Sequence, residues 1–129
     1  MPDASPQSSA TLLLVEDHLD TAKMMQLILE RQGYVVRIAG SVASALEAAH
    51  AEKIAVCIAD LRLPDGDGKA LCRELFARHN VPCICLSGDV SRTDLDPDPD
   101  GCFVAYLTKP LDLAQMLEAI QKVLSANSR

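Results

Sequence analysis

The sequence predicts a single α/β domain built on a doubly wound, five-stranded parallel sheet. Short apolar runs alternate along the chain with amphipathic segments of helical periodicity, and this alternation is typical of consecutive βαβ units. The chain has 129 residues, which is near the commonest size of one domain, and 49% of its residues are hydrophobic. Both values fit one globular unit with an aliphatic core.

The first half of the chain supplies three predicted strands and two helices. Residues 12–15 form an apolar run that is short enough for a strand buried on both faces. Gly33 is a natural residue to end the helix that follows, and Ser41 is a typical cap for the next helix. Residues 1–10 are polar and are predicted to be a flexible tail, so the domain is expected to occupy 11–126. The predicted strands are 12–15, 34–39 and 54–59, and the predicted helices are about 20–32 and 42–52.

The second half continues the alternation with one interruption. A helix is due between the last two strands, but Pro97 and Pro99 oppose a regular helix there, and five acidic residues lie within 89–100. We therefore expect the fourth helix to be degraded or absent. The segment 61–68 contains proline and glycines and is predicted to be a loop. The predicted strands are 81–86 and 103–107, and the predicted helices are 69–79 and about 112–124.

Five strands in this pattern favour the flavodoxin-like order 2-1-3-4-5, which places a functional site at the carboxyl ends of the first and third strands. Glu16 and Asp17 follow the first strand, and Asp60 follows the third. Neighbouring carboxylates repel one another unless a cation lies among them, and Mg²⁺ prefers such oxygen ligands. The ion, the Lys109 ammonium and the Ser87 hydroxyl could then stabilise a phosphoryl group that is transferred to Asp60.

The charge and the composition argue against several classes of function. Eighteen acidic residues against 12 basic ones give a net charge of -6, which disfavours binding to a nucleic-acid backbone. Aromatic residues are only 3%, so bases would find few stacking partners. The sequence contains no apolar run of roughly 18 residues and no secretory signal at its start. We expect a cytoplasmic protein without membrane insertion or direct nucleic-acid contact.

Four motifs together resemble the receiver domain of two-component response regulators, a chemotaxis-regulator-like phosphoacceptor domain. They are LLLVED, IADLRLPDGDG, CLSG and YLTKP, within about residues 11–126. The second motif has Pro64 four residues and Gly68 eight residues after Asp60, and these two are implied to shape the following loop. The resemblance implies a Mg²⁺ or Mn²⁺ cofactor and a phosphoacceptor role for Asp60.

The same resemblance implies a role for each matching residue. Asp17 corresponds to the direct metal ligand, Glu16 to an acid that acts through water, and Arg62 to the residue whose backbone carbonyl binds the ion. Ser87 corresponds to the switch hydroxyl and Lys109 to the conserved-type lysine of the family. Tyr106 corresponds to the switch aromatic, although a half-buried core residue would fit that position too. Pro110 corresponds to the residue that usually follows a cis peptide bond.

The implied function is a phosphorelay module that accepts a phosphoryl group from a histidine kinase or a histidine phosphotransfer protein and switches conformation for a protein target that the sequence does not name. It would catalyse its own phosphorylation and slow dephosphorylation, without being an enzyme otherwise. A single-domain regulator and the terminal receiver of a hybrid histidine kinase both fit. The alternative is a non-phosphorylated pseudo-receiver that serves as a protein-binding scaffold.

Two charged residues are candidates for controlling water access to the phosphorylated site. Arg62 lies two residues after Asp60, and Asp89 lies two residues after Ser87. Opposite charges on adjacent loops could meet across the site, and such a pair would affect access more than stability. The alternative is two solvated side chains that never touch.

Cysteine and histidine patterns predict no further site. The cysteines are odd in number and lack a C-x-x-C pair, so we expect reduced core residues. Cys83 and Cys85 share one side of a strand, but no neighbouring pair completes a metal-ligand set. The three histidines are scattered and are expected on the surface or in loops: His18, His50 and His79.

Overall fold

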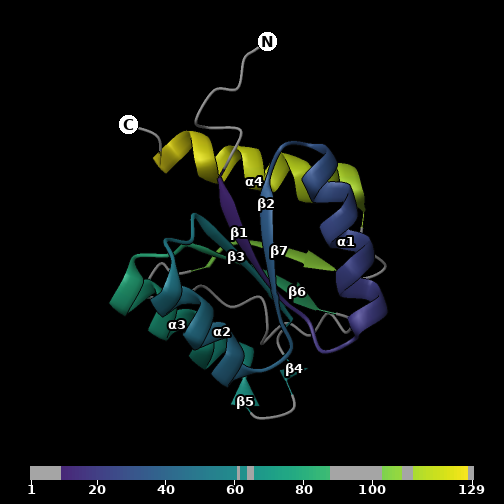
Figure 1. Ribbon diagram of the computed structural model, residues 1–129. Helices are drawn as coiled ribbons and strands as arrows, with labels where there is room; N and C mark the ends of the chain where they lie inside the picture. Colours follow the sequence, from purple (N-terminus) through teal and green to yellow (C-terminus); the bar gives the residue numbers. More distant parts are fainter. Residues whose placement is uncertain (1–9, 61, 64–65, 88–102, 109–111, 128–129) are drawn as a thin grey trace.

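A computed structural model describes residues 10–60, 62–63, 66–87, 103–108 and 112–127 of the protein (Figure 1). Five parallel strands form one sheet in the order β2-β1-β3-β6-β7. In chain order of the main strands this is 2-1-3-4-5, so the predicted fold class and strand order are confirmed. The five strands are β1 (Thr11–Val15), β2 (Val35–Ala39), β3 (Val56–Asp60), β6 (Cys83–Ser87) and β7 (Phe103–Thr108).

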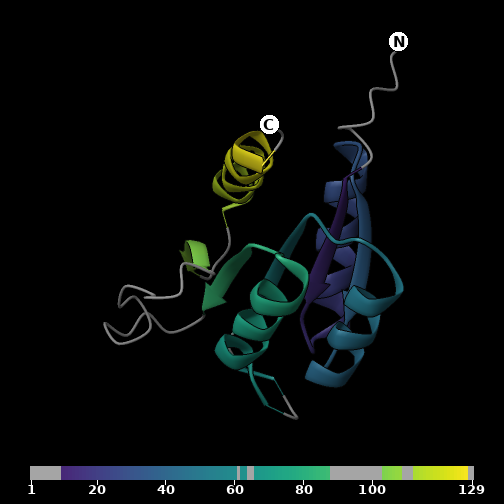
Figure 2. The same ribbon diagram turned by 90° about the vertical axis from the view of Figure 1, so that its left-hand side faces the viewer.

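Helices cover both faces of this sheet. Successive residues of a strand point to opposite faces, and in β1 the side chains of Leu12 and Leu14 join a core with α1 and α4. Leu13 and Val15 join a second core with α2 and α3, and these two helices lie side by side in both views (Figure 1, Figure 2). Burial on both faces explains the continuous apolar runs of the central strands. The helices are α1 (Leu19–Arg31), α2 (Val42–Ala51), α3 (Gly68–His79) and α4 (Leu113–Asn127).

The helix ends agree with the expected chemistry. Ser41 accepts a hydrogen bond from the Ser44 main-chain N–H, and the Ser44 hydroxyl accepts one from the Ser41 N–H, which completes a capping box for α2. The Asp112 carboxylate accepts a hydrogen bond from the main-chain N–H of Ala114 over 2.9 Å at the start of α4. Gly33 follows α1 with a φ of 97°, a value that favours glycine.

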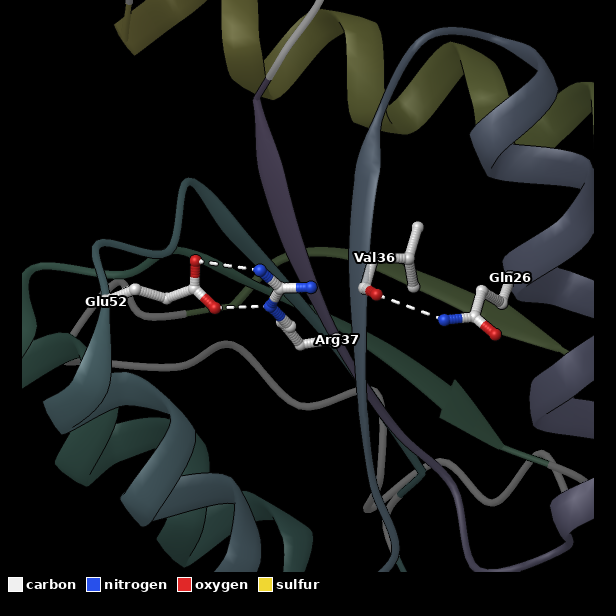
Figure 3. A network of polar contacts seen from close by, with 4 residues as sticks. All are labelled: Gln26, Val36, Arg37 and Glu52. Atoms are coloured by element: carbon white, nitrogen blue, oxygen red, sulfur yellow. Dashed lines mark hydrogen bonds and ion pairs between the residues drawn. The ribbon is translucent and has the colours of Figure 1, made fainter.

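Edge strand β2 is held by contacts on both sides (Figure 3). The Gln26 side-chain amide of α1 donates a hydrogen bond to the Val36 carbonyl over 3.1 Å. Arg37 forms an ion pair with Glu52, which directly follows α2, and this hydrogen-bonded contact raises the pKa of Arg37. The strand is therefore tied to the helices on either side of it by polar contacts as well as by its apolar residues.

The segment after β3 differs from the predicted loop. It contains a small antiparallel hairpin of β4 (Arg62–Leu63) and β5 (Gly66–Asp67), and α3 begins directly after it (Figure 2). A Cβ atom on Gly66 would lie 3.0 Å from a methyl carbon of Val42, so the hairpin approaches α2 closely at a residue without a side chain.

Two predictions about irregular segments lie outside the described residues. They are the flexible tail predicted over residues 1–10, of which the structure describes Ala10 alone, and the degraded or absent fourth helix predicted within residues 89–101. Among the helices that the structure does describe, none is long and apolar enough to cross a membrane.

Candidate functional site

Asp60 stands at the carboxyl end of the central strand β3. The four residues before it are buried, whereas Asp60 itself is half-buried, so its carboxylate lies at the boundary between core and surface. Val15 of β1 pairs with Ala59, and the next residues, Glu16 and Asp60, therefore stand at the same level of two adjacent strands. This register brings together two of the acids that the sequence placed at strand ends.

Glu16 is the only charged side chain that is buried among the residues whose side chains the structure describes. Its carboxylate accepts a hydrogen bond from the His18 main-chain N–H over 3.2 Å, and its Oε2 atom lies 3.5 Å from Nδ1 of His18. A buried carboxylate is stable only where hydrogen bonds or positive charge compensate the loss of water. The loop after β1 thus holds a negative charge in a low-dielectric position next to Asp60.

Asp17 completes a group of three possible metal ligands. One ligand atom each from Glu16, Asp17 and His18 lies within 4.8 Å of the others. Asp17 and His18 are exposed, and Nδ1 of His18 lies 3.5 Å from Oδ1 of Asp17. Two carboxylates beside a half-buried third one at the end of the next strand are hard oxygen donors, so the donor set fits Mg²⁺ or Mn²⁺.

His18 is the residue of this group that sequence reasoning missed. It was expected to be a scattered surface histidine, and it is indeed exposed, but it contacts both acids. Its place directly after the acid pair was the available signal. The Nδ1 atom of His18 lies 3.5 Å from an oxygen of each acid, so the loop after β1 holds all three side chains together.

The remaining predicted site residues follow the next two strands. Ser87 is the last residue of β6 and comes directly after Leu86, the register partner of Asp60. It pairs with Thr108, the last residue of β7, and Lys109 is the next residue of the chain. The backbone therefore brings Asp60 and Ser87 to the same edge of the sheet.

Several of the predicted contacts lie outside the described residues. This applies to the whole of Lys109, Pro110 and Asp89, and to the side chains of Ser87, Arg62 and Tyr106. The backbone of Arg62 is described in β4, two residues after Asp60, and that of Tyr106 in β7, paired with Cys85. The roles given to these side chains stay predictions.

Residues 12–121 match the family model of the response regulator receiver domain. The chain belongs to this family. It is 34% identical over 113 residues to the transcriptional regulatory protein CseB of Streptomyces coelicolor, an alignment that covers 88% of this chain and 48% of that protein. The receiver domain therefore spans about half the length of the CseB relatives it matches. It is also 29% identical over 114 residues to a 14.6 kDa protein of Leptolyngbya boryana, of which it covers 87%.

Solved structures show the same architecture. A CheY-like response regulator receiver domain protein from Methanospirillum hungatei superimposes with a TM-score of 0.84 at 26% identity, over 92% of this chain and 95% of that chain. The signal receiver domain of an HD-domain-containing protein from Pseudomonas fluorescens gives a TM-score of 0.85 at 23% identity, over 92% and 96% of the two chains. The second likeness concerns the fold alone.

Proposed function

We propose that this receiver domain, residues 11–126, accepts a phosphoryl group on Asp60 from the phosphohistidine of a histidine kinase or a histidine phosphotransfer protein. The observation that carries the proposal is the buried Glu16 carboxylate at the level of Asp60, with Asp17 beside it. Burying one carboxylate and placing two more next to it costs free energy that a divalent cation would compensate.

Glu16, Asp17, Asp60 and the main-chain carbonyl of Arg62 would hold Mg²⁺ or Mn²⁺, with Asp17 as a direct ligand and Glu16 as an indirect one. An ion bound there would supply positive charge that neutralises the phosphoryl oxygens. Asp60 Oδ attacks the phosphorus, the P–N bond of the phosphohistidine breaks, and its electron pair stays on the imidazole nitrogen. The product is an aspartyl phosphate on Asp60.

Ser87, at the end of β6, and Lys109, directly after β7, would bind the transferred phosphoryl group. In this proposal the Lys109 ammonium binds one phosphoryl oxygen and the Ser87 hydroxyl another. Their movement toward the phosphate, with a rotation of Tyr106, would be the conformational switch. The domain promotes its own phosphorylation and slow dephosphorylation, and it passes the signal to a protein target. The CseB relatives are named transcriptional regulatory proteins. The 129 residues of the present chain would themselves make no direct contact with nucleic acid.

Incubation with acetyl phosphate and Mg²⁺ tests this proposal. Intact-mass spectrometry is expected to show the gain of one phosphoryl group, which disappears in Asp60→Asn and on chelation of the ion. Asp20→Asn is the matched control, because Asp20 is an exposed acid in the first turn of α1. A gain that persists in Asp60→Asn would refute the acceptor role, and no gain in the wild-type protein would favour the pseudo-receiver scaffold.

A further inference from the structure

Three cysteines from separate parts of the sequence meet in the core beneath α3. Cys57 lies in β3, Cys72 in α3 and Cys83 in β6, and all three are 0% exposed. Their Sγ atoms all lie within 4.8 Å of one another. All three are free thiols, as is Cys85 two residues further along β6. These cysteines show no paired spacing in the sequence, because only the fold brings them together.

Strand pairing and helix packing create the group. Cys57 and Cys83 are register partners on adjacent parallel strands, so their side chains point to the same face of the sheet. α3 covers that face, and Cys72 lies between Leu71 and Leu75 in its buried stripe. The group therefore lies between the sheet and α3, within the apolar cluster that includes Leu71 and Leu75.

The thiols interact with one another and with backbone acceptors. The Cys83 thiol lies 3.8 Å from the Cys72 carbonyl oxygen and 3.8 Å from that of Val81, distances that suit a weak S–H donor. Hydrogen bonds from Cys57, Cys83 and Cys85 lower the pKa of the Cys72 thiol, against the effect of burial. Hydrogen bonding with Cys57 and Cys72, together with burial, raises the pKa of Cys83. The three thiols therefore titrate as one coupled group.

We propose that Cys57, Cys72 and Cys83 form a binding site for a soft, thiophilic monovalent metal ion, with Cu⁺ as the matching species. Three atoms within 4.8 Å of one another leave a point no more than about 2.8 Å from each of them. A metal–thiolate bond is about 2.3 Å for zinc, so each sulfur would move by only about 0.5 Å. Side-chain adjustments of this size leave the strands and α3 in place.

The ligand type and the number of sulfurs select the ion. Thiolate ligands favour Cu⁺, Zn²⁺ and iron–sulfur clusters, while hard ions such as Mg²⁺ prefer oxygen. Zn²⁺ requires four ligands, whereas Cu⁺ is satisfied by three sulfurs. Thiolates rather than thiols are the metal ligands, so the coordinating cysteines lose their protons on binding, and the cation compensates part of the negative charge that this leaves in the apolar core.

Because Cys57, Cys72 and Cys83 are fully buried, the ion would bind while the chain folds and not afterwards. Thiols without solvent exposure are poor substrates for oxidants, which disfavours a redox switch at this position. A structural metal ion needs no open path in the folded protein, because it can bind while the chain folds. The ion would then link β3, β6 and α3, and the domain would be more stable in its presence.

Anaerobic refolding with one equivalent of Cu⁺ tests the proposal, using reduced protein in which Cys102→Ala leaves only the group of three and Cys85 as thiols. Elemental analysis after desalting is expected to give one copper per chain, with near-ultraviolet sulfur-to-copper charge transfer and a raised Tm. Competition with a Cu⁺ chelator then measures affinity in variants. Cys72→Ala is expected to lower affinity by at least about tenfold. The apolar replacement avoids leaving an unpaired hydroxyl in the core.

Cys85→Ala is the comparison variant: Cys85 is buried on the same strand and its thiol hydrogen-bonds to Cys72, but its sulfur is not one of the three proposed ligands. It is expected to retain copper, and far-ultraviolet circular dichroism reports folding of each variant. If Cys72→Ala does not fold, Cys57→Ala or Cys83→Ala replaces it. Substoichiometric copper in the refolded protein would overturn the proposal. So would equal losses in Cys72→Ala and Cys85→Ala, which would indicate a four-sulfur site suited to Zn²⁺.

Discussion

Two separate variants, Glu16→Gln and Asp17→Asn, each remove one negative charge from the predicted ion site and keep the shape of the side chain. The two positions differ in environment. The Glu16 side chain is 0% exposed and accepts the His18 N–H bond, whereas the Asp17 side chain is 39% exposed. We therefore expect the two variants to fail in different ways, Glu16→Gln in stability and Asp17→Asn in ion binding.

The magnitude follows from the hydrogen bond. A bond to a charged acceptor contributes about 1.5–3 kcal/mol, and a bond between neutral groups about 0.5–1.5 kcal/mol. The exposed contact of Asp17 with His18 contributes little. Both variants gain similarly from reduced repulsion, so without ions Glu16→Gln should be less stable than Asp17→Asn by about 1 kcal/mol. This corresponds to a Tm difference of about 3–5 °C for a domain of this size.

Added Mg²⁺ should reverse the ranking. An ion at 100 times its dissociation constant stabilises a protein by about 2.7 kcal/mol, and Asp17→Asn should lose most of this gain if Asp17 is the direct ligand. Urea titrations of the wild type and both variants measure the free energy of unfolding of each protein, once with a chelator and once with Mg²⁺. Each variant is then compared with the wild type under both conditions. Equal stability of the two variants without ions would refute the argument from burial. A full Mg²⁺ response in Asp17→Asn would refute its role as direct ligand.

Three other predictions concern transfer, hydrolysis and packing. Lys109→Ala should keep the Mg²⁺-dependent rise in Tm but lose phosphorylation by acetyl phosphate, and an unchanged rate by intact-mass analysis would contradict its role. If Arg62 and Asp89 together restrict the access of water to the phosphorylated site, either alanine variant should speed loss of the phosphoryl group. The double variant should then match the single ones, whereas additive rates of dephosphorylation would mean that the two residues act separately. Ile120→Ala on the buried side of α4 should cost about 2–5 kcal/mol in urea unfolding, while the neighbouring exposed Gln121→Ala should cost less than about 0.5 kcal/mol, and similar costs would argue against this packing of α4.

The sequence by itself determined the main elements and their order. A strand covered on both faces needs apolar side chains at consecutive positions. The runs at residues 12–15 and 56–59 have this pattern, so they directly predict buried strands. The Ser41 cap and the stop at Gly33 were equally readable, because helix ends are governed by local hydrogen bonding and backbone conformation. The β4–β5 hairpin was not, since two-residue strands carry no periodic pattern and proline with glycines indicates only a turn.

The acids at the strand ends were also predictable, because parallel strands bring their carboxyl ends to one edge. Glu16 and Asp60 were expected to be neighbours, and the register of β1 with β3 places them at one level. The burial of Glu16 and its contact with His18 were decided by the tertiary structure, since they depend on how the loop after β1 turns over the core.

Groupings between distant positions belong to the tertiary structure alone. The rings of His50 and His79, at the ends of α2 and α3, meet in an edge-to-face contact with centroids 4.9 Å apart, although the sequence predicted isolated surface residues. The thiols of Cys57, Cys72 and Cys83 meet for two reasons. The pairing of β3 with β6 aligns Cys57 with Cys83, and α3 packs Cys72 against the same face of the sheet. Sequence periodicity fixes which face of its own element a residue occupies, but only packing fixes which residues of other elements lie opposite.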